Sequence, residues 1–561
     1  MKKVLPILVA GALVLTLGLS GCGTGGGNKG GSANPAVWDV NEQPRDKIKD
    51  GGVFRGAFGT EITSWNIHSV RGNPNELRMM QSPLSELWYL EDGGGNHTMN
   101  TNFLDSVVAD MVDGQLVVTM KISDQAQWND GTPIGFEDWD ATVKALNGEN
   151  EKFAAASTEG WDQIDSVTQG ETAKDVILTF KAAYPDWVVV VMAGPLHRDS
   201  CVDPATFNDG WNEYNMDWYA GPFIVTDFAA SPTTITMERN PNWWGDPGKL
   251  DTIIWKYVSP NQWGTAFANG ELDYIDVGTN TDVYDQADKT KDTVIRKSAG
   301  PNYRHITFNS LSPVLSDQLV RQAIVMGINR DEITASDLAG LPVSPQALRK
   351  NSNLFIQGQE GYKDWADITG IKYDPRGAKA KLEEAGYEMG EDGYFVKGGE
   401  VLAVSFAVLR GVRVSENEGQ MIQDQLREIG IRIDLQNVNT ATDFPGIVDQ
   451  HNFDMIAFSW MGSSFPLMGI GQLFGEGSEF NHAQLTTPLL EELRPLIDTN
   501  PDPIARLKQG QEVDQALWEN VHTLPLYQRP TITAVRAGLA NFGSFGLAQI
   551  PYTWTNVGYV K

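Results

Sequence analysis

Residues 420–438, "QMIQDQLREIGIRIDLQNV", constrain the fold more than any other segment of the chain. In the first half, apolar residues recur at helical spacing, namely Ile422, Leu426 and Ile429. Gly430 then predicts the end of the helix, because glycine readily adopts the left-handed conformation common there. In the second half, apolar and polar residues alternate as in a strand, with the apolar positions at Ile431, Ile433 and Leu435. A helix followed at once by a strand belongs in a sheet with helices on its face, so the sequence predicts a mixed α/β fold.

Other segments agree with this fold class. Residues 316–333, "SDQLVRQAIVMGINRDEI", predict a helix with a serine and aspartate start. In residues 373–387, Asp374 is the expected N-cap and Pro375 the first helical residue. Alternating runs near 115–122 and 233–238 predict antiparallel strands instead.

Length and charge narrow the class of protein. The 561 residues exceed what one hydrophobic core normally holds, so two or three domains are expected. A hydrophobic content of 41% is that of a globular protein. The formal net charge of −29 repels phosphate backbones, which argues against nucleic acid as a partner.

The N-terminus predicts export. Lys2 and Lys3 precede an almost wholly apolar run at 4–19, the pattern of a secretory signal peptide. Residues 19–22, Leu-Ser-Gly-Cys, resemble the lipobox of bacterial lipoproteins. That resemblance implies cleavage after residue 21, lipid on Cys22, and a location on the extracytoplasmic face of the bacterial cell membrane. The glycine-rich stretch that follows predicts a flexible tether over 22–35. The alternative is a free or buried cysteine near the N-terminus.

The sequence contains none of the common catalytic signatures. It has no H-E-x-x-H, P-loop, G-x-S-x-G or EF-hand pattern. The seven histidines are scattered, with no pair at the spacing that places two ligands on one helix face. Cys201, the second of two cysteines, is interpreted as a small core residue. We therefore expect no catalytic residues, no metal and no cofactor.

Several motifs, in order along the chain, carry a resemblance. They are "GTEITSWNIHS" (59–69), "MKISDQAQWNDGTPIGFEDW" (120–139), "YAGPFIVTDFAASPTTITMERNPNWWG" (219–245), "FANGELDYIDV" (267–277), "FDMIAFSW" (453–460) and "LPLY" (524–527). Together with the helical segments above, they resemble the family 5 extracellular solute-binding proteins of ABC importers, the oligopeptide, dipeptide and nickel group. The resemblance covers nearly the whole chain after the tether.

The resemblance implies a two-lobed, periplasmic-binding-protein-like α/β fold of the Venus-flytrap type, with an additional domain in the N-terminal half. The expected boundaries are a signal peptide at 1–21, the lipidated cysteine and tether at 22–35, lobe I at 36–85 with 195–305 and 526–561, the additional domain at 86–194, and lobe II at 306–525. It also implies ABC permease and ATPase partners, and we expect a monomer.

The resemblance also suggests ligand-binding residues. Trp460 follows a buried-looking strand where peptide-binding relatives carry a tryptophan on the cleft wall; the alternative is a core tryptophan. Three residues later, where relatives carry an aspartate for the ligand's ammonium, this chain has Ser463. Arg71 stands where a relative has an acid, although an exposed loop arginine is an equal alternative. Together, these two departures favour an anionic or neutral group at that end of the ligand, as in N-terminally blocked peptides.

Three more candidates lie on the expected strands between the lobes. Tyr303 and Arg304 line either the hinge or the cleft, and Tyr527 is a cleft candidate at the return to lobe I.

The leading hypothesis is a non-enzymatic lipoprotein that captures a small solute, foremost a peptide, and delivers it to a membrane permease. Strand-like hydrogen bonds to a peptide backbone allow varied side chains. An oligosaccharide is the alternative ligand, because the 17 tryptophans suit stacking on sugar faces. A surface sensor with the same fold is the alternative role.

Overall fold

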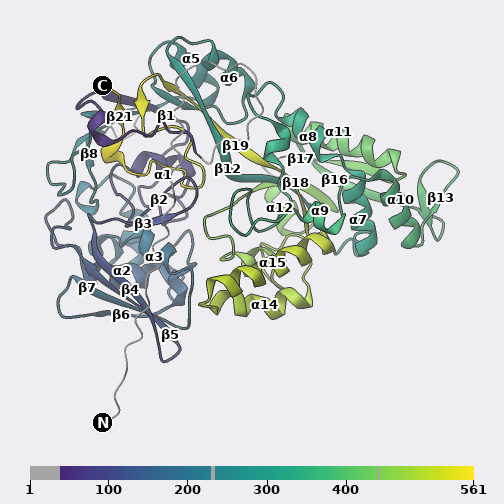
Figure 1. Cartoon of the computed structure of the whole chain (residues 1–561), viewed down its shortest axis with the longest axis horizontal. Coiled ribbons are helices and arrows are strands. Elements are labelled where there is room, and N and C mark those ends of the chain that lie inside the picture. Colours follow the sequence, from purple (N-terminus) through teal and green to yellow (C-terminus); the bar gives the residue numbers. More distant parts are fainter. Residues whose placement is uncertain (1–37, 229–233, 440–442) are drawn as a thin grey trace, which may run out of the picture.

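The computed structural model describes residues 38–228, 234–439 and 443–561. The predicted signal peptide, Cys22 and the tether lie outside these ranges. Among the described residues, no helix has both the length and the apolar character needed to cross a membrane. The described chain forms two lobes connected by long strands, with an additional domain beside the first lobe (Figure 1). The predicted two-lobed α/β architecture is therefore confirmed.

The largest sheet joins the two lobes. Its strand order is β11-β19-β12-β18-β16-β17. The strands are β11 (Tyr274–Asp276), β12 (Thr293–Phe308), β16 (Ala403–Arg410), β17 (Arg432–Asn439), β18 (Met455–Met461) and β19 (Thr523–Arg536). β12 and β19 pair antiparallel over most of their 16 and 14 residues. They run from the top of the first lobe into the second, so both lobes share them (Figure 1).

The first lobe contains a four-stranded sheet in the order β1-β10-β9-β8. Its strands are β1 (Val53–Phe58), β8 (Phe223–Phe228), β9 (Thr234–Arg239) and β10 (Thr252–Tyr257). β1 pairs parallel with β10 although almost 200 residues separate them in the chain, so the lobe is assembled from distant segments. The C-terminal pair β20 (Leu539–Ala540) and β21 (Gly558–Tyr559) lies in the same lobe.

The additional domain is built on an antiparallel sheet in the order β4-β5-β7-β6. Its strands are β4 (Leu104–Val112), β5 (Gln115–Ile122), β6 (Ile164–Gln169) and β7 (Asp175–Phe180), and the hairpin β2 (Tyr89–Glu91) and β3 (His97–Met99) lies nearby. The buried residues of β5 alternate with accessible ones, as the sequence predicts for a sheet with one covered face. Cys201 is buried in this domain's core, as predicted.

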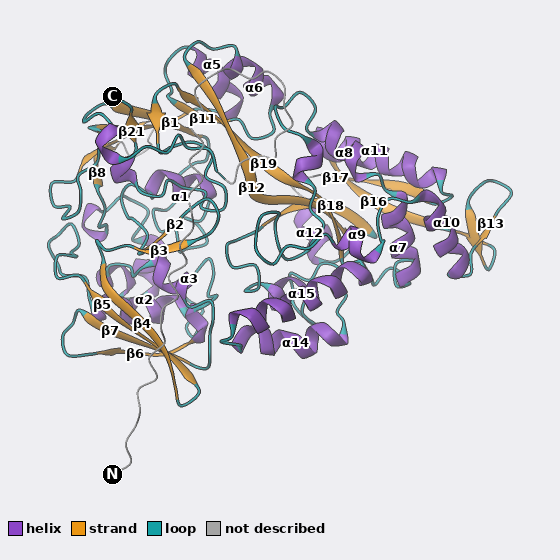
Figure 2. Cartoon of the chain, viewed as in Figure 1, coloured by secondary structure: helices purple, strands orange, loops and turns teal. Residues whose placement is uncertain are grey.

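Helices are concentrated in the second lobe (Figure 2). Those before residue 300 are α1 (Asn75–Gln81), α2 (Phe136–Leu146), α3 (Val188–Ala193), α4 (Pro204–Asp209), α5 (Trp263–Ala268) and α6 (Thr281–Asp288). Those after it are α7 (Gln318–Gly327), α8 (Arg330–Asp337), α9 (Trp365–Thr369), α10 (Pro375–Glu384), α11 (Arg413–Glu428), α12 (Phe444–Asp449), α13 (Ile470–Phe474), α14 (Pro488–Thr499) and α15 (Pro503–Asn520). A small sheet of β13 (Glu388–Met389), β14 (Phe395–Lys397) and β15 (Glu400–Val401) completes the lobe.

The local signals in the sequence are mostly confirmed. α11 ends before Gly430, whose φ of +87° is left-handed, and β17 follows at once. Asp374 caps α10 by accepting from the Arg376 amide at 3.2 Å. The helix predicted over 316–333 is instead two helices, because Ile328 adopts an extended conformation. The Asn329 amide there donates to the side chain of Gln425 at 2.9 Å rather than to a helical carbonyl.

The cores partly follow the predicted domain boundaries. One hydrophobic core gathers residues from the N-terminal, middle and C-terminal segments assigned to lobe I, such as Phe54, Phe223 and Phe542. Residues 263–288 fall in the range assigned to lobe I, but Phe267 and Val283 pack into the core that also holds the second lobe's helices. The reason is that β11 extends the six-stranded sheet through β19. The boundaries themselves stay a prediction.

Candidate ligand-binding site

A cavity of about 590 Å³ lies between the lobes. This volume is within the range of about 300–1,000 Å³ typical of ligand sites. Most of the wall comes from the first lobe and the additional domain. The connecting strands contribute Pro301, Asn302 and Thr531, and the second lobe contributes Met468. The cavity therefore has contributions from both lobes, the additional domain and the strands that connect them.

Helix α1 and the turn after it form a two-sided segment at the cavity. Leu77, Met80 and Leu84 are buried in the first lobe's core. The opposite face, at helical spacing, borders the cavity with Arg78, Gln81, Ser82 and Ser85. This segment therefore presents mainly polar side chains to the cavity, together with Met79.

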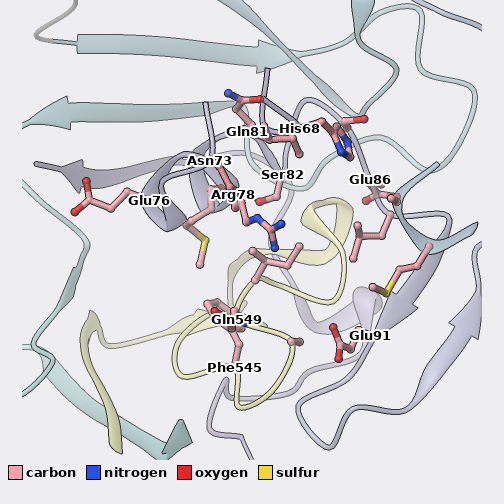
Figure 3. Close-up of a pocket in the computed structure, with 18 of the residues that line it drawn as sticks. His68, Asn73, Glu76, Arg78, Gln81, Ser82, Glu86, Glu91, Phe545 and Gln549 are labelled. Atoms are coloured by element: carbon pink, nitrogen blue, oxygen red, sulfur yellow. Dashed lines mark hydrogen bonds between the residues drawn. The ribbon is translucent and has the colours of Figure 1, made fainter. Parts of the chain in front are cut away.

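The rest of the wall is rich in tryptophan. Seven of the lining residues are tryptophans, namely Trp65, Trp128, Trp161, Trp211, Trp218, Trp255 and Trp263. Trp65, Trp211 and Trp255 are fully buried, so they support the wall more than they offer an open ring face. The C-terminal segment adds Phe545 and Gln549, which lie opposite α1 in Figure 3. The wall combines apolar surface with a few polar groups, which is usual for ligand sites.

Acidic side chains of the wall are largely held by the protein. Glu76 Oε2 accepts from the backbone amides of Gly59 and Thr60, at 2.9 and 2.8 Å. Glu86 accepts from the Thr553 hydroxyl, and burial raises the pKa of Glu86. Burial also raises the pKa of Asp276 and of Glu159.

Arg78 and His68 are the basic residues of the wall. Burial, with a smaller contribution from the Arg78 charge, lowers the pKa of His68 to about 4, so this imidazole is neutral at pH 7. Arg78 is accessible from the cavity, and its guanidinium extends from α1 toward the centre of it (Figure 3).

The two halves touch across the cleft. Asp186, just before α3, accepts from both terminal nitrogens of Arg506 on α15, with Nη1 at 2.9 Å from Oδ1. The side chains of both residues are about nine-tenths buried, at 8% and 12% exposure. On the other side, His97 stacks on Phe465 at 4.7 Å and its Nε2 is 3.3 Å from the Ser464 hydroxyl. These contacts join the additional domain to the second lobe, in addition to the connecting strands.

Trp460 lies within a stack of rings on the second lobe. His305 and His482 lie nearly parallel to its ring, with centroids at 5.9 and 5.7 Å. Trp460 is half-buried and does not line the cavity described above. Its part in ligand binding stays a prediction.

The candidate residues on the connecting strands contact other residues of the protein and not the cavity. Arg304 forms a buried bidentate ion pair with Glu418 of α11, with Nε at 2.7 Å from Oε1. The Lys350 ammonium lies over the ring of Tyr303, 4.2 Å from its centroid. Tyr527 is buried, at 2% exposure. None of the three lines the cavity, and their part in binding also stays a prediction.

Arg71 and Ser463 are not brought together at the cavity. The Arg71 guanidinium donates to Asp209 and to the Thr63 carbonyl, both at 3.0 Å, on the exposed surface of the first lobe. Ser463 is exposed, and its hydroxyl accepts from the Phe465 amide at 3.1 Å. Neither residue borders the cavity.

The sequence analysis did not select Arg78, although the helical pattern around it indicates its position. The spacing of Leu77, Met80 and Leu84 predicts the buried face of α1, and the intervening Arg78 and Ser82 then fall on the opposite face. It also missed Asp186 and Arg506, which are 320 residues apart and carry no local signal. Among the described residues, no group of three or more histidine, cysteine, aspartate or glutamate side chains is arranged to hold a metal ion.

Comparison with known proteins gives the family. The model of "Bacterial extracellular solute-binding proteins, family 5 Middle" matches residues 101–481. The chain belongs to family 5. In Mycobacterium tuberculosis, the oligopeptide-binding protein OppA is 30% identical over 532 residues, covering 93% of this chain and 87% of that protein. In Bacillus subtilis, the oligopeptide-binding protein AppA is 25% identical over 63% of this chain and 64% of its own length.

Solved family 5 structures share the fold. A periplasmic EDTA-binding protein, EppA, superposes with a TM-score of 0.83 at 24% identity, over 95% of this chain and all of that one. AppA from Bacillus subtilis in complex with a nonapeptide gives a TM-score of 0.70 at 19% identity, over 92% of this chain and all of that one. As a family 5 protein, this chain is the substrate-binding component of an ABC transporter, and the predicted class is confirmed.

We expect Arg304→Met to lower the free energy of unfolding by about 3–5 kcal/mol, because it leaves the Glu418 carboxylate buried without its partner. Urea unfolding followed by tryptophan fluorescence measures this. The double variant Arg304→Met with Glu418→Leu is expected to recover most of the loss. A single variant as stable as the wild type would contradict a role for the pair in stability.

The stability of the protein is expected to depend on pH through Asp498, which interacts with Asp186. Burial raises the pKa of Asp498 to about 6, with Asp186 adding to the rise, while Arg494 and Arg506 oppose it. An aspartate in the unfolded chain has a pKa of about 3.9, so the folded state binds this proton more tightly. Its contribution to stability is complete below about pH 4 and is lost as the pH rises to about 6.

Asp498→Asn is therefore expected to gain stability relative to the wild type as the pH rises from 4.5 to 7.5, as measured by melting temperatures at both pH values. Asp424→Asn, on the exposed face of α11, is the matched control and is expected to show no such trend. A pH-independent difference for Asp498→Asn would refute the assignment.

Proposed function

We propose that this protein captures oligopeptides in the cavity between its lobes and presents them to an ABC permease for import. The observation that carries this proposal is the cavity itself, which has walls from both lobes, while the Asp186–Arg506 pair and the His97 contacts join the two sides of the cleft. A ligand held there contacts both lobes, as capture between them requires. The identity of 30% to OppA supports a peptide as the solute.

An oligosaccharide is the second candidate ligand, and the tryptophans in the wall favour it. However, three of these rings are fully buried, which leaves fewer faces for stacking on a sugar. A sensor that no longer transports would have the same cavity, and growth on peptides as the sole source of a required amino acid separates it from an importer.

Ligand binding is expected to raise the melting temperature. A ligand that binds only the folded protein stabilises it by about 2.7 kcal/mol at a hundredfold excess over Kd. Differential scanning fluorimetry with a panel of short peptides and oligosaccharides is the measurement, and native mass spectrometry of the purified protein identifies any co-purified ligand. Stabilisation by sugars and by no peptide would replace the peptide proposal, and conversion of a panel member to a product would refute a purely binding role.

We also propose that Cys22 carries lipid and holds the protein at the extracytoplasmic face of the membrane. The lipobox-like residues 19–22 support this. Cys22→Ser is expected to move the protein from the detergent phase to the aqueous phase in Triton X-114 partitioning, or to leave it unprocessed with its signal peptide. Full lipid modification of Cys22→Ser would contradict the proposal, and Cys201→Ser is the control because that thiol is buried.

A further inference from the structure

Arg78 is the arginine of the cavity wall, and its side chain is exposed to the cavity rather than covered by protein. Desolvation by the surrounding residues lowers its pKa. Among the described residues, no carboxylate forms an ion pair with it and no side-chain hydrogen bond from it is present. Two of the cavity acids are held by other groups, since Glu76 accepts from the backbone of 59–60 and Glu86 from Thr553. In Figure 3, Glu76 points away on one side of Arg78, and Glu86 and Glu91 lie on the other.

A ligand that fills the cavity would remove the Arg78 guanidinium from water. That step is unfavourable for a cation unless the ligand supplies a partner of opposite charge with good hydrogen-bond geometry. Arg71 shows the contrast, because its guanidinium already has Asp209 as a partner. The Arg78 guanidinium instead extends into the cavity (Figure 3).

We propose that Arg78 binds a carboxylate of the ligand and so determines which ligands this protein accepts. This inference rests on the proposed function and names the chemistry that the cavity recognises. The planar guanidinium offers two parallel N–H donors that match a carboxylate. The stripe formed by Arg78, Gln81, Ser82 and Ser85 places amide and hydroxyl groups beside that position.

The rest of the wall limits how much negative charge the ligand carries. Glu91 is buried beside His97, with Oε1 3.7 Å from Nε2, and Glu159 and Asp276 also border the cavity. These groups disfavour a ligand with several carboxylates and suit one with a single carboxylate and an otherwise neutral or cationic body. A peptide supplies that single carboxylate either at its C-terminus or on one acidic side chain.

The test compares ligands that differ only in the carboxylate. Peptides that stabilise the wild type are titrated by calorimetry as the free acid and as the C-terminal amide, and with one glutamate or one glutamine. We expect at least about a 30-fold preference for the carboxylate form in one of the two pairs, which identifies its source. Arg78→Gln is expected to abolish the preference. Arg78→Lys is expected to keep part of it, because the positive charge remains but the two parallel N–H donors of the guanidinium are lost. Tighter binding of citrate than of either peptide pair would overturn the single-carboxylate assignment.

Arg427→Gln is the matched control, since Arg427 is exposed on α11 and outside the cavity. It is expected to keep the wild-type preference. An unchanged preference in Arg78→Gln would overturn the proposal for Arg78 while leaving peptide binding intact, whereas failure of every peptide to bind the wild type would count against the proposed function.

A second measurement judges Arg78 without any ligand. Because its charge has no carboxylate partner among the residues that the structure describes, Arg78→Gln is expected to leave the melting temperature of the ligand-free protein unchanged or raised. A clear decrease in melting temperature, absent in Arg427→Gln, would show that Arg78 supports the fold and would overturn its assignment to the ligand.

Discussion

The antiparallel pairing of β12 with β19 is the constraint on which both lobes depend. These strands belong to one sheet, yet the first lobe is built at one end of them and the second at the other. The pairing is interrupted between Ala299 and Tyr303, where Gly300 lies so close to Arg529 that a Cβ atom would be 2.7 Å from its carbonyl oxygen. Only glycine fits there, and Gln528 donates to the Gly300 carbonyl at 2.7 Å. Because Pro301 and Asn302 follow directly, the irregular part of the connection is also part of the cavity wall.

Charged groups on the two sides of the cleft affect how the lobes come together. The protein carries a net charge of −29, and Asp186 of the additional domain helps to raise the pKa of Asp498 in the second lobe, while Asp498 helps to raise that of Glu159. Arg506 offsets this repulsion, because it pairs with Asp186, lowers the pKa of Asp498 and is mostly shielded from water. The contacts across the cleft include this buried ion pair and the stacking of His97 on Phe465, and a bound ligand would add its own contacts to them.

The balance of charges also matters within the cavity. Glu76 is held by backbone amides and Glu86 by the Thr553 hydroxyl, and burial raises the pKa of Glu86. A cation that has no carboxylate partner among the described residues, and that a bound ligand would shield from water, favours a ligand of opposite charge. Because Glu76 and Glu86 already have partners and the Arg78 guanidinium is available, the site favours a ligand that carries a carboxylate.

The sequence by itself determined the α/β class, the caps and ends of helices such as α10 and α11, and, through motifs in family order, the two-lobed fold. The class and the helix ends follow from local spacing, for which a few neighbouring residues suffice, whereas the resemblance to family 5 implied the two-lobed fold. Only the tertiary structure located the cavity. Trp460 and Arg304 do not line it and instead contact the rings of His305 and His482 and the carboxylate of Glu418, so their part in binding stays a prediction. Arg71 and Arg78 look alike in the sequence, and what separates them is whether a carboxylate from a distant segment, Asp209, lies within reach. Contacts between residues far apart in the chain carry no local pattern, so the pairing of charges, and the cavity that distant segments line together, emerge only when the chain is folded.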